Sequence, residues 1–142
     1  MIEINKIEIA KELLDSALYH YYDSQQYFAS IHCAGAAEEI LGRYIESHGG
    51  EPAFEKQNED LRKISKILND IESPKKDITY VMNYAKNKTK HMDKEDDEIL
   101  VLDPKLEAED LLDRAVGNYY NLMAHLDLEE TEYIQRYNQV RV

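Results

Sequence analysis

The chain has 142 residues, of which 43% are hydrophobic and 32% charged, a composition typical of globular rather than disordered proteins. This length favours a single domain, residues 1–142, that is large enough to bury a core. The formal net charge of −12 disfavours a general nucleic-acid binder, because neutralisation of phosphates supplies most non-specific affinity. With no signal-peptide pattern, no apolar stretch of the ~18 residues that span a bilayer and one cysteine, Cys33, we expect a cytoplasmic protein.

The first half of the sequence predicts two long helices. Apolar residues at helical spacing indicate a helix over about residues 4–22 and a second over about residues 25–47, with Asp23 and Ser24 as N-cap candidates. The second helix is apolar nearly all round, which is typical of a central helix. The Gly-Gly-Glu-Pro run of residues 49–52 should end it.

Small residues are concentrated in the second helix. Gly35 and Gly42 lie inside it, although glycine there costs about 1 kcal/mol relative to alanine. Together with Ala34, Ala36 and Ala37 they predict a smooth surface, on which another helix of this chain or of a second copy can lie closely.

The second half predicts three further helices and a tail. A third helix should span about residues 59–71, with these apolar side chains inward: Leu61, Ile64, Ile67, Leu68 and Ile71. Ser73 and Pro74 should open a fourth helix that continues through about Lys90. Residues 93–103 read as an acidic loop, and Asp103 with Pro104 should start a fifth helix. The tail from about residue 128 can add a short helix, so the predicted fold is an all-α, up-and-down bundle of four to five helices.

Several familiar kinds of site are excluded by the sequence. It has no glycine-rich phosphate loop, no G-x-S-x-G and no paired C-x-x-C motif. No histidine follows an acidic residue by three positions, as a di-iron bundle requires. We therefore expect no metal site and no cofactor.

Glu38 lies on an apolar face of the second predicted helix and must be satisfied by a partner there. It is either part of a polar, substrate-binding cleft or a boundary residue paired with a lysine, with Arg43 or with a tyrosine hydroxyl. His20 and His32 read as core or boundary histidines. Eleven tyrosines could stack on bases, but tyrosines at helical spacing are more often packing residues.

The most informative segment is residues 86–91, with the sequence Lys-Asn-Lys-Thr-Lys-His. Six lysines against two aspartates leave residues 74–94 at +4, whereas nine carboxylates against one lysine leave residues 95–113 at −8. Asn87 and His91 are i, i+4 neighbours, placed on the stripe that also carries Tyr84. A histidine beside clustered lysines can hold and cleave a phosphodiester, but cations also cluster at helix C-termini because they offset the helix dipole.

The segment resembles the motif of the HEPN superfamily of prokaryotic helical bundles, in which a His follows an Arg by four to six residues, with a polar residue between. Lys86 stands at the Arg position here, and the runs at residues 34–42 and 107–116 also look similar to small bacterial proteins of this kind. The resemblance covers most of the chain as an architecture. It implies a homodimer, metal-independent endoribonuclease activity and a toxin–antitoxin setting, with an antitoxin or nucleotidyltransferase as partner.

The resemblance also implies residue roles. His91 would move the proton of the ribose 2′-hydroxyl or of the leaving oxygen, Lys86 would bind the scissile phosphate, and Asn87 would orient one of these groups. Substrate binding would involve Lys88, Lys90, Tyr84 and Glu38. Lysine lacks the planar, two-pronged grip of arginine on phosphate, so a second hypothesis stands beside the nuclease. In it the chain is a non-catalytic dimeric interaction module that binds a partner protein or a nucleotide.

Overall fold

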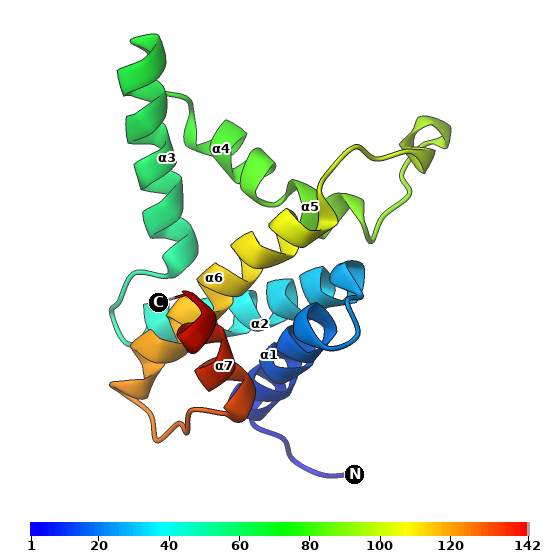
Figure 1. Ribbon diagram of the computed structural model, residues 1–142. Coiled ribbons are helices and arrows are strands. Elements are labelled where there is room, and N and C mark those ends of the chain that lie inside the picture. The colour runs from blue at the N-terminus through cyan, green and yellow to red at the C-terminus, as the bar shows by residue number, and fades with distance from the viewer. Residues whose placement is uncertain (142) are drawn as a thin grey trace.

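The computed structural model describes residues 1–141, except for the side chains at positions 95, 96 and 141, and this part of the chain is helical without a β-strand. Figure 1 shows the arrangement of the elements. Their bounds are α1 (Lys6–Tyr22), α2 (Tyr27–Ser47), α3 (Ala53–Asn69), α4 (Lys75–Met82), α5 (Tyr84–Lys88), the 3-10 helix η1 (Glu95–Glu98), α6 (Pro104–Met123) and α7 (Glu132–Arg141). The all-α class predicted from the sequence is confirmed.

The core of the molecule lies where α2 packs between α1 and α6, and α7 closes it from the α1 side. Leucine, isoleucine and alanine side chains fill it, with the ring of Tyr119 at its centre. The largest fully buried apolar side chains are Leu14, Leu18, Ile31, Leu41, Ile45, Leu112, Tyr119, Leu122 and Ile134. The central position predicted for the second helix is therefore confirmed.

Helices α3 and α4 form an arm that projects from this core (Figure 1). We use the name arm for residues 53–82. Within it α3 packs mainly on α4, through a hydrogen bond from Asn58 Nδ2 to Thr79 Oγ1 of 3.0 Å and one from Ser65 Oγ to Ser73 Oγ of 2.9 Å. Polar contacts thus tie α3 to α4 and to the loop before it, whereas the core is filled mainly by apolar side chains.

Of the five side chains predicted to point inward from the third helix, Leu61 is half-buried and the other four are exposed, so the prediction was wrong for those four. Ile64 is 50% exposed, Ile67 79%, Leu68 75% and Ile71 73%. The helix also begins earlier than predicted, directly after Pro52, and ends where Asp70 adopts the left-handed conformation with φ 58°. Helical spacing correctly identified one amphipathic face, but it carries no information on what covers that face.

Two other boundaries differ from the sequence prediction. Asp23 and Ser24 do not cap α2, because the chain turns at Gln25, which has a φ of 54°. Ser24 Oγ lies instead 3.0 Å from His20 Nδ1 at the end of α1. The predicted fourth helix is divided at Asn83 into α4 and α5, which follow one another in Figure 1.

The small-residue surface of α2 is covered at Gly35 and Gly42 by the chain itself. A Cβ atom at Gly35 would lie 2.6 Å from Lys86 Cδ, so α5 approaches α2 at this glycine. At Gly42 a Cβ atom would lie 3.5 Å from Pro52 Cβ, at the start of α3. At these glycines the expected close packing is provided by the same chain, whereas Ala36 is exposed, and packing of a second copy stays a prediction.

The last two predicted helices are confirmed. Asp103 caps α6, since its Oδ1 accepts hydrogen bonds from the backbone N–H groups of Lys105 at 3.0 Å and Leu106 at 3.1 Å. The tail forms α7, whose Tyr133 and Tyr137 hydroxyls donate to carboxylates of Asp23 and Asp113. Within residues 1–141, no helix has both the length and the apolar character that crossing a bilayer requires.

Candidate functional site

The segment predicted to be catalytic begins inside α5 and continues beyond its end. The helix ends at Lys88, and Thr89 follows as its C-cap. The Thr89 hydroxyl donates to the carbonyl oxygen of Ala85 at 2.6 Å and lies 3.2 Å from His32 Nε2. Because α5 stops before His91, the imidazole is not placed one helical turn after Asn87, as the sequence analysis assumed.

Lys86 is a buried residue that contacts α2. Its side-chain Nζ lies 2.6 Å from Glu39 Oε1, and the residue is only 7% exposed. Its aliphatic stem lies against Gly35, where a side chain would collide with it. The ammonium group predicted to bind phosphate is therefore held by a carboxylate of the same chain, and its stem attaches α5 to the core.

The other residues of the segment are spread over the surface near the end of α5. Asn87, Lys90 and His91 are exposed, and Lys88 Nζ lies 3.7 Å from Asp97 Oδ1. Tyr84 is half-buried, and its ring forms an edge-on pair with Tyr80 at 5.9 Å between centroids. Within the described part of the chain, Lys86, Asn87 and His91 do not converge on one pocket. Their catalytic roles stay predictions.

Glu38 is buried by an ion pair that the sequence analysis did not find. Arg114 on α6 donates from Nε to Glu38 Oε1 at 2.8 Å, and the side chains of both residues are 4% exposed. The pairing partners expected from the sequence, a lysine, Arg43 or a tyrosine, were wrong. A signal was available, since Arg114 shares the apolar phase of α6 with Leu111 and Ala115.

Arg114 also connects the core to both helices of the arm. Its two terminal nitrogens donate to Gln57 Oε1 on α3 and to the carbonyl oxygen of Met82 at the end of α4, each at 3.3 Å. The guanidinium carbon lies 5.6 Å from the centre of the Phe54 ring, within the range of a cation–π contact. One buried guanidinium thus sets how the base of the arm sits on α6.

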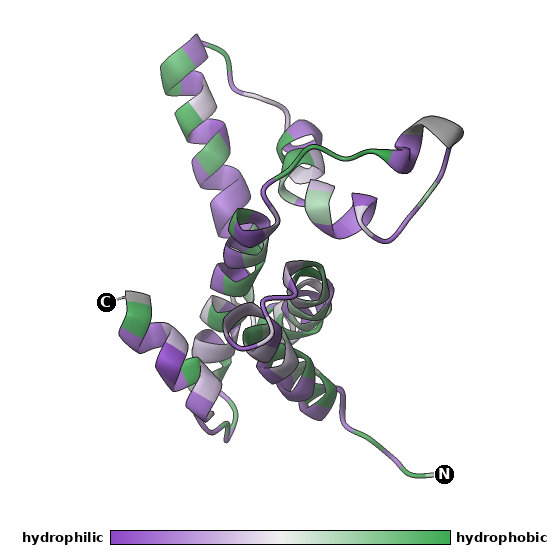
Figure 2. Cartoon of the chain, turned by 45° about the vertical axis from the view of Figure 1, so that its right-hand side comes forward, coloured by the Kyte–Doolittle hydropathy of each residue, from purple (hydrophilic) through white to green (hydrophobic). Residues whose placement is uncertain are grey.

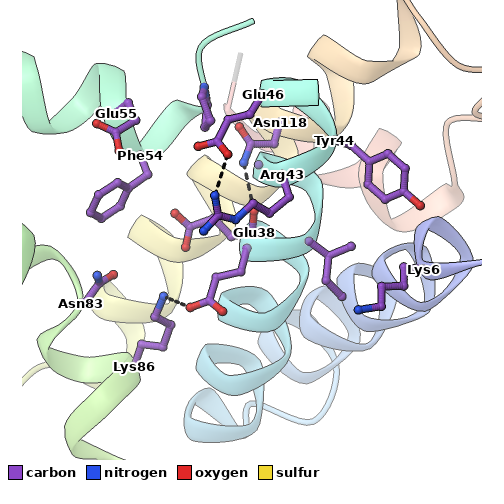
Figure 3. Close-up of a pocket in the computed structure, with 14 residues that line it drawn as sticks. Lys6, Glu38, Arg43, Tyr44, Glu46, Phe54, Glu55, Asn83, Lys86 and Asn118 are labelled. Carbon is purple, nitrogen blue, oxygen red and sulfur yellow. Dashed lines mark hydrogen bonds and ion pairs between the residues drawn. The ribbon is translucent and has the colours of Figure 1, made fainter. Parts of the chain in front are cut away.

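A groove of about 680 Å³ runs along α2 between the N-terminus of α1 and the base of the arm. Glu38 and Asn118 are buried residues along it, Arg43 is an exposed residue of α2 beside them, and Figure 3 shows Phe54, Asn83 and Lys86 on the side of the arm. The charged groups at the centre of this groove are compensated in pairs, Lys86 by Glu39 and Arg43 by Glu46 at 2.9 Å. The groove therefore lacks the concentration of positive charge that would select a phosphodiester.

The described side chains contain no group of three or more His, Cys, Asp or Glu residues arranged to hold a metal ion.

The most distinctive surface is the exposed apolar stripe of the arm, which we define as Ile64, Ile67, Leu68 and Ile71. Figure 2 shows hydrophobic residues alternating with hydrophilic ones along α3, on the part of the arm that stands away from the other helices. On α4, Tyr80 and Val81 are exposed as well. Exposed contiguous apolar surface of this kind marks interaction sites in folded proteins.

The charge of the chain is divided unevenly between the arm and the rest. The arm, residues 53–82, carries six Lys and Arg against six Asp and Glu, a balance of 0. The other residues carry 11 Lys and Arg against 23 Asp and Glu, a balance of −12. The apolar stripe therefore lies on a neutral arm of an acidic protein.

Comparison with known proteins does not identify the chain, since no family model, no curated protein and no solved structure matches it.

Proposed function

We propose that this protein is a non-catalytic interaction module whose binding element is the arm. The observation that carries the proposal is the apolar stripe, four large aliphatic side chains that the rest of the chain leaves at least half exposed. Burying such a side chain contributes roughly 1.5–3 kcal/mol. A partner that covers all four would thus gain several kcal/mol of binding free energy from apolar burial.

The charged groups around the candidate site support the same proposal. Lys86 is held by Glu39, and Glu38 is held by Arg114, so both residues act in joining helices. A catalytic site needs groups that are positioned but free to react with a substrate. These ion pairs instead fix the arm and α5 on the core, as a docking element requires.

A metal-independent ribonuclease is the competing proposal, and one observation favours it. Asn87, Lys90 and His91 are exposed near the end of α5 and could reach a substrate. Wild-type protein would then cleave structured RNA in the presence of EDTA, and His91→Ala would abolish cleavage. Equal cleavage by both proteins, or none by either, contradicts a catalytic site at His91.

The interaction module is tested by removing the stripe without disturbing the core. Tagged wild-type protein and the variant Ile67→Asp/Leu68→Asp are used to capture proteins, including untagged copies of the chain itself, from an extract of the source cells. We expect at least one protein to be retained by the wild type and lost by the variant. The control is Lys66→Asp/Asn69→Asp, which places two aspartates on exposed polar positions of α3 and changes the net charge by −3, against −2 for the stripe variant. Identical retention by all three proteins would contradict the proposal.

A further inference from the structure

We propose that the occupant of the apolar stripe is the stripe of a second copy, with the two α3 helices antiparallel about a two-fold axis at the tip of the arm. This inference rests on the proposed function, because it names the partner of the same surface. A two-fold contact is isologous, so one patch must be complementary to itself. The stripe meets that requirement in both its apolar and its charged residues.

The apolar residues define the register of the pair. The four exposed side chains are centred between Ile67 and Leu68, so the two-fold axis should pass close to these positions. Antiparallel pairing about this point places Ile67 beside Leu68 of the partner subunit, and Ile64 near Ile71 of the partner subunit, which directly follows the left-handed turn at the end of α3. Every exposed apolar side chain of the stripe then meets another apolar side chain.

The charges flanking the stripe favour the antiparallel direction. Arg62, Lys63 and Lys66 form a basic turn before the centre of the stripe, and Asp70 and Glu72 follow the centre at the tip. Within the chain Arg62 pairs with Glu72 at 3.7 Å and Lys63 with Glu59 at 2.7 Å, so Lys66 and Asp70 are the charges that a second copy would meet. An antiparallel pair sets the acidic tip of each copy beside the basic turn of the other. A parallel pair would set like charges side by side, which disfavours it.

The charge of the whole chain favours contact at the tips rather than between the cores. Outside the arm each copy has a balance of −12, so two cores in contact would repel. The arm extends away from that charge in Figures 1 and 2. Tip-to-tip pairing therefore buries the apolar stripe while it keeps the two acidic cores apart.

The size of the stripe fits a reversible dimer. Four aliphatic side chains that each bury roughly 60–120 Å² correspond to about 240–480 Å² of apolar surface per copy. A stable standard interface buries about 800 Å² per partner. We therefore expect a dissociation constant on the order of 1–100 μM, which sedimentation can measure directly.

The experiment measures sedimentation equilibrium of the purified full chain from about 1 μM to about 1 mM, a range that brackets the expected dissociation constant. The wild type should pass from monomer to dimer, and Ile67→Asp/Leu68→Asp should stay monomeric with an unchanged circular dichroism spectrum. The control Lys66→Asp/Asn69→Asp keeps the four apolar side chains and should still dimerise, although more weakly, because one cation of the basic turn is reversed. Wild-type protein that stays monomeric over this range would overturn the inference.

Two further variants test the direction of the pair. In a Cys33→Ser background, Ile67→Cys lies near the axis and should form a disulfide-linked dimer on mild oxidation. Asp60 lies two helical turns before Ile67 on the same side of α3. The variant Asp60→Cys should not form a disulfide-linked dimer, because only a parallel pair brings position 60 of one copy beside position 60 of the other. Disulfide-linked dimers of both variants would overturn the antiparallel arrangement.

Charge reversal provides an independent test. Lys66→Glu should weaken dimerisation about 3- to 10-fold, since it opposes the acidic tip of the partner. The double variant Lys66→Glu/Asp70→Lys exchanges the two charges and should restore the wild-type constant. Equal dimerisation of all three proteins would contradict the charge pairing.

The outcomes also separate this inference from the proposed function. If the protein stays monomeric but still captures another protein, and loses it in Ile67→Asp/Leu68→Asp, the stripe binds a different partner. That result would overturn the inference of a second copy and would support the proposed interaction module. Monomeric protein that cosediments with vesicles of anionic phospholipid, and loses this binding in Ile67→Asp/Leu68→Asp, would assign the stripe to a membrane surface instead.

Discussion

Helices α3 and α6 are similar in sequence and opposite in environment. Both start directly after or at a proline and carry leucine or isoleucine at helical spacing. In α6 these side chains, such as Leu111 and Leu112, are buried against α1 and α2, whereas in α3 Ile67 and Leu68 face away from the chain. An amphipathic helix therefore shows that one face must be covered, and the covering element can belong to the same molecule or to another.

The two regions also differ in how they are held together. The core is joined mainly by buried apolar side chains, with the Glu38–Arg114 ion pair among them, and the arm by hydrogen bonds and the contacts of Arg114. Helices with few buried apolar contacts open locally at lower free energy than core helices. The following variants test this difference, in order of decreasing expected effect.

The largest effect is expected for Arg114→Met. This change removes the partner of the buried Glu38 carboxylate and the hydrogen bonds to both helices of the arm. Leaving a buried charge unpaired costs roughly 3–5 kcal/mol of unfolding free energy, which urea denaturation can measure. The double variant Glu38→Leu/Arg114→Met should recover most of the loss, and a loss below about 1 kcal/mol in the single variant would contradict a fully desolvated pair.

Matched truncations in the two regions should give the next largest difference. Leu112→Ala creates a cavity in the core and should cost roughly 2–5 kcal/mol of unfolding free energy. Ile67→Ala removes an exposed side chain. It should change the unfolding free energy by less than about 0.5 kcal/mol at concentrations where the protein is monomeric. A comparable cost for both would show that the stripe is covered within one chain.

The contact between α5 and the core is tested by Gly35→Ala. The new methyl group would lie 2.6 Å from Lys86 Cδ, so the lysine stem must move and its ion pair with Glu39 is lost. Overpacking of this kind costs about 1–3 kcal/mol. The same change in a Lys86→Ala background should cost less, and a double-mutant cycle measures the difference. Equal costs in the two backgrounds would show that the stem does not occupy this space.

The smallest effect concerns α7, which is held in part by Asp23. A hydrogen bond from Tyr133, and then the hydrogen bond and charge of Arg136, lower the pKa of Asp23 below its ordinary value of 3.8. Because the folded pKa is the lower one, this group stabilises the fold above pH 3.8 and loses that contribution as the pH falls through the folded pKa. The thermal midpoint of wild-type protein should exceed that of Asp23→Asn at neutral pH, and the two should converge in acid. A constant difference at every pH would contradict the linkage.

Features that depend on neighbours along the chain were predicted well. The cap at Asp103, the central α2 and the short α7 follow from side chains within one or two turns. The pairing of Glu38 with Arg114, 76 positions later, depends on how α2 crosses α6 and was not predicted. The ion pair of Lys86 with Glu39 was missed for the same reason, although it decides whether that ammonium group is free.

The sequence by itself determined an all-helical chain with an acidic body and a basic middle region, because helix formation and charge are properties of local residues. Only the tertiary structure decided that the apolar side of α3 stays uncovered and that Lys86 and Glu38 are committed to ion pairs. These facts depend on the directions in which helices leave the core, and such directions result from packing between residues distant in sequence.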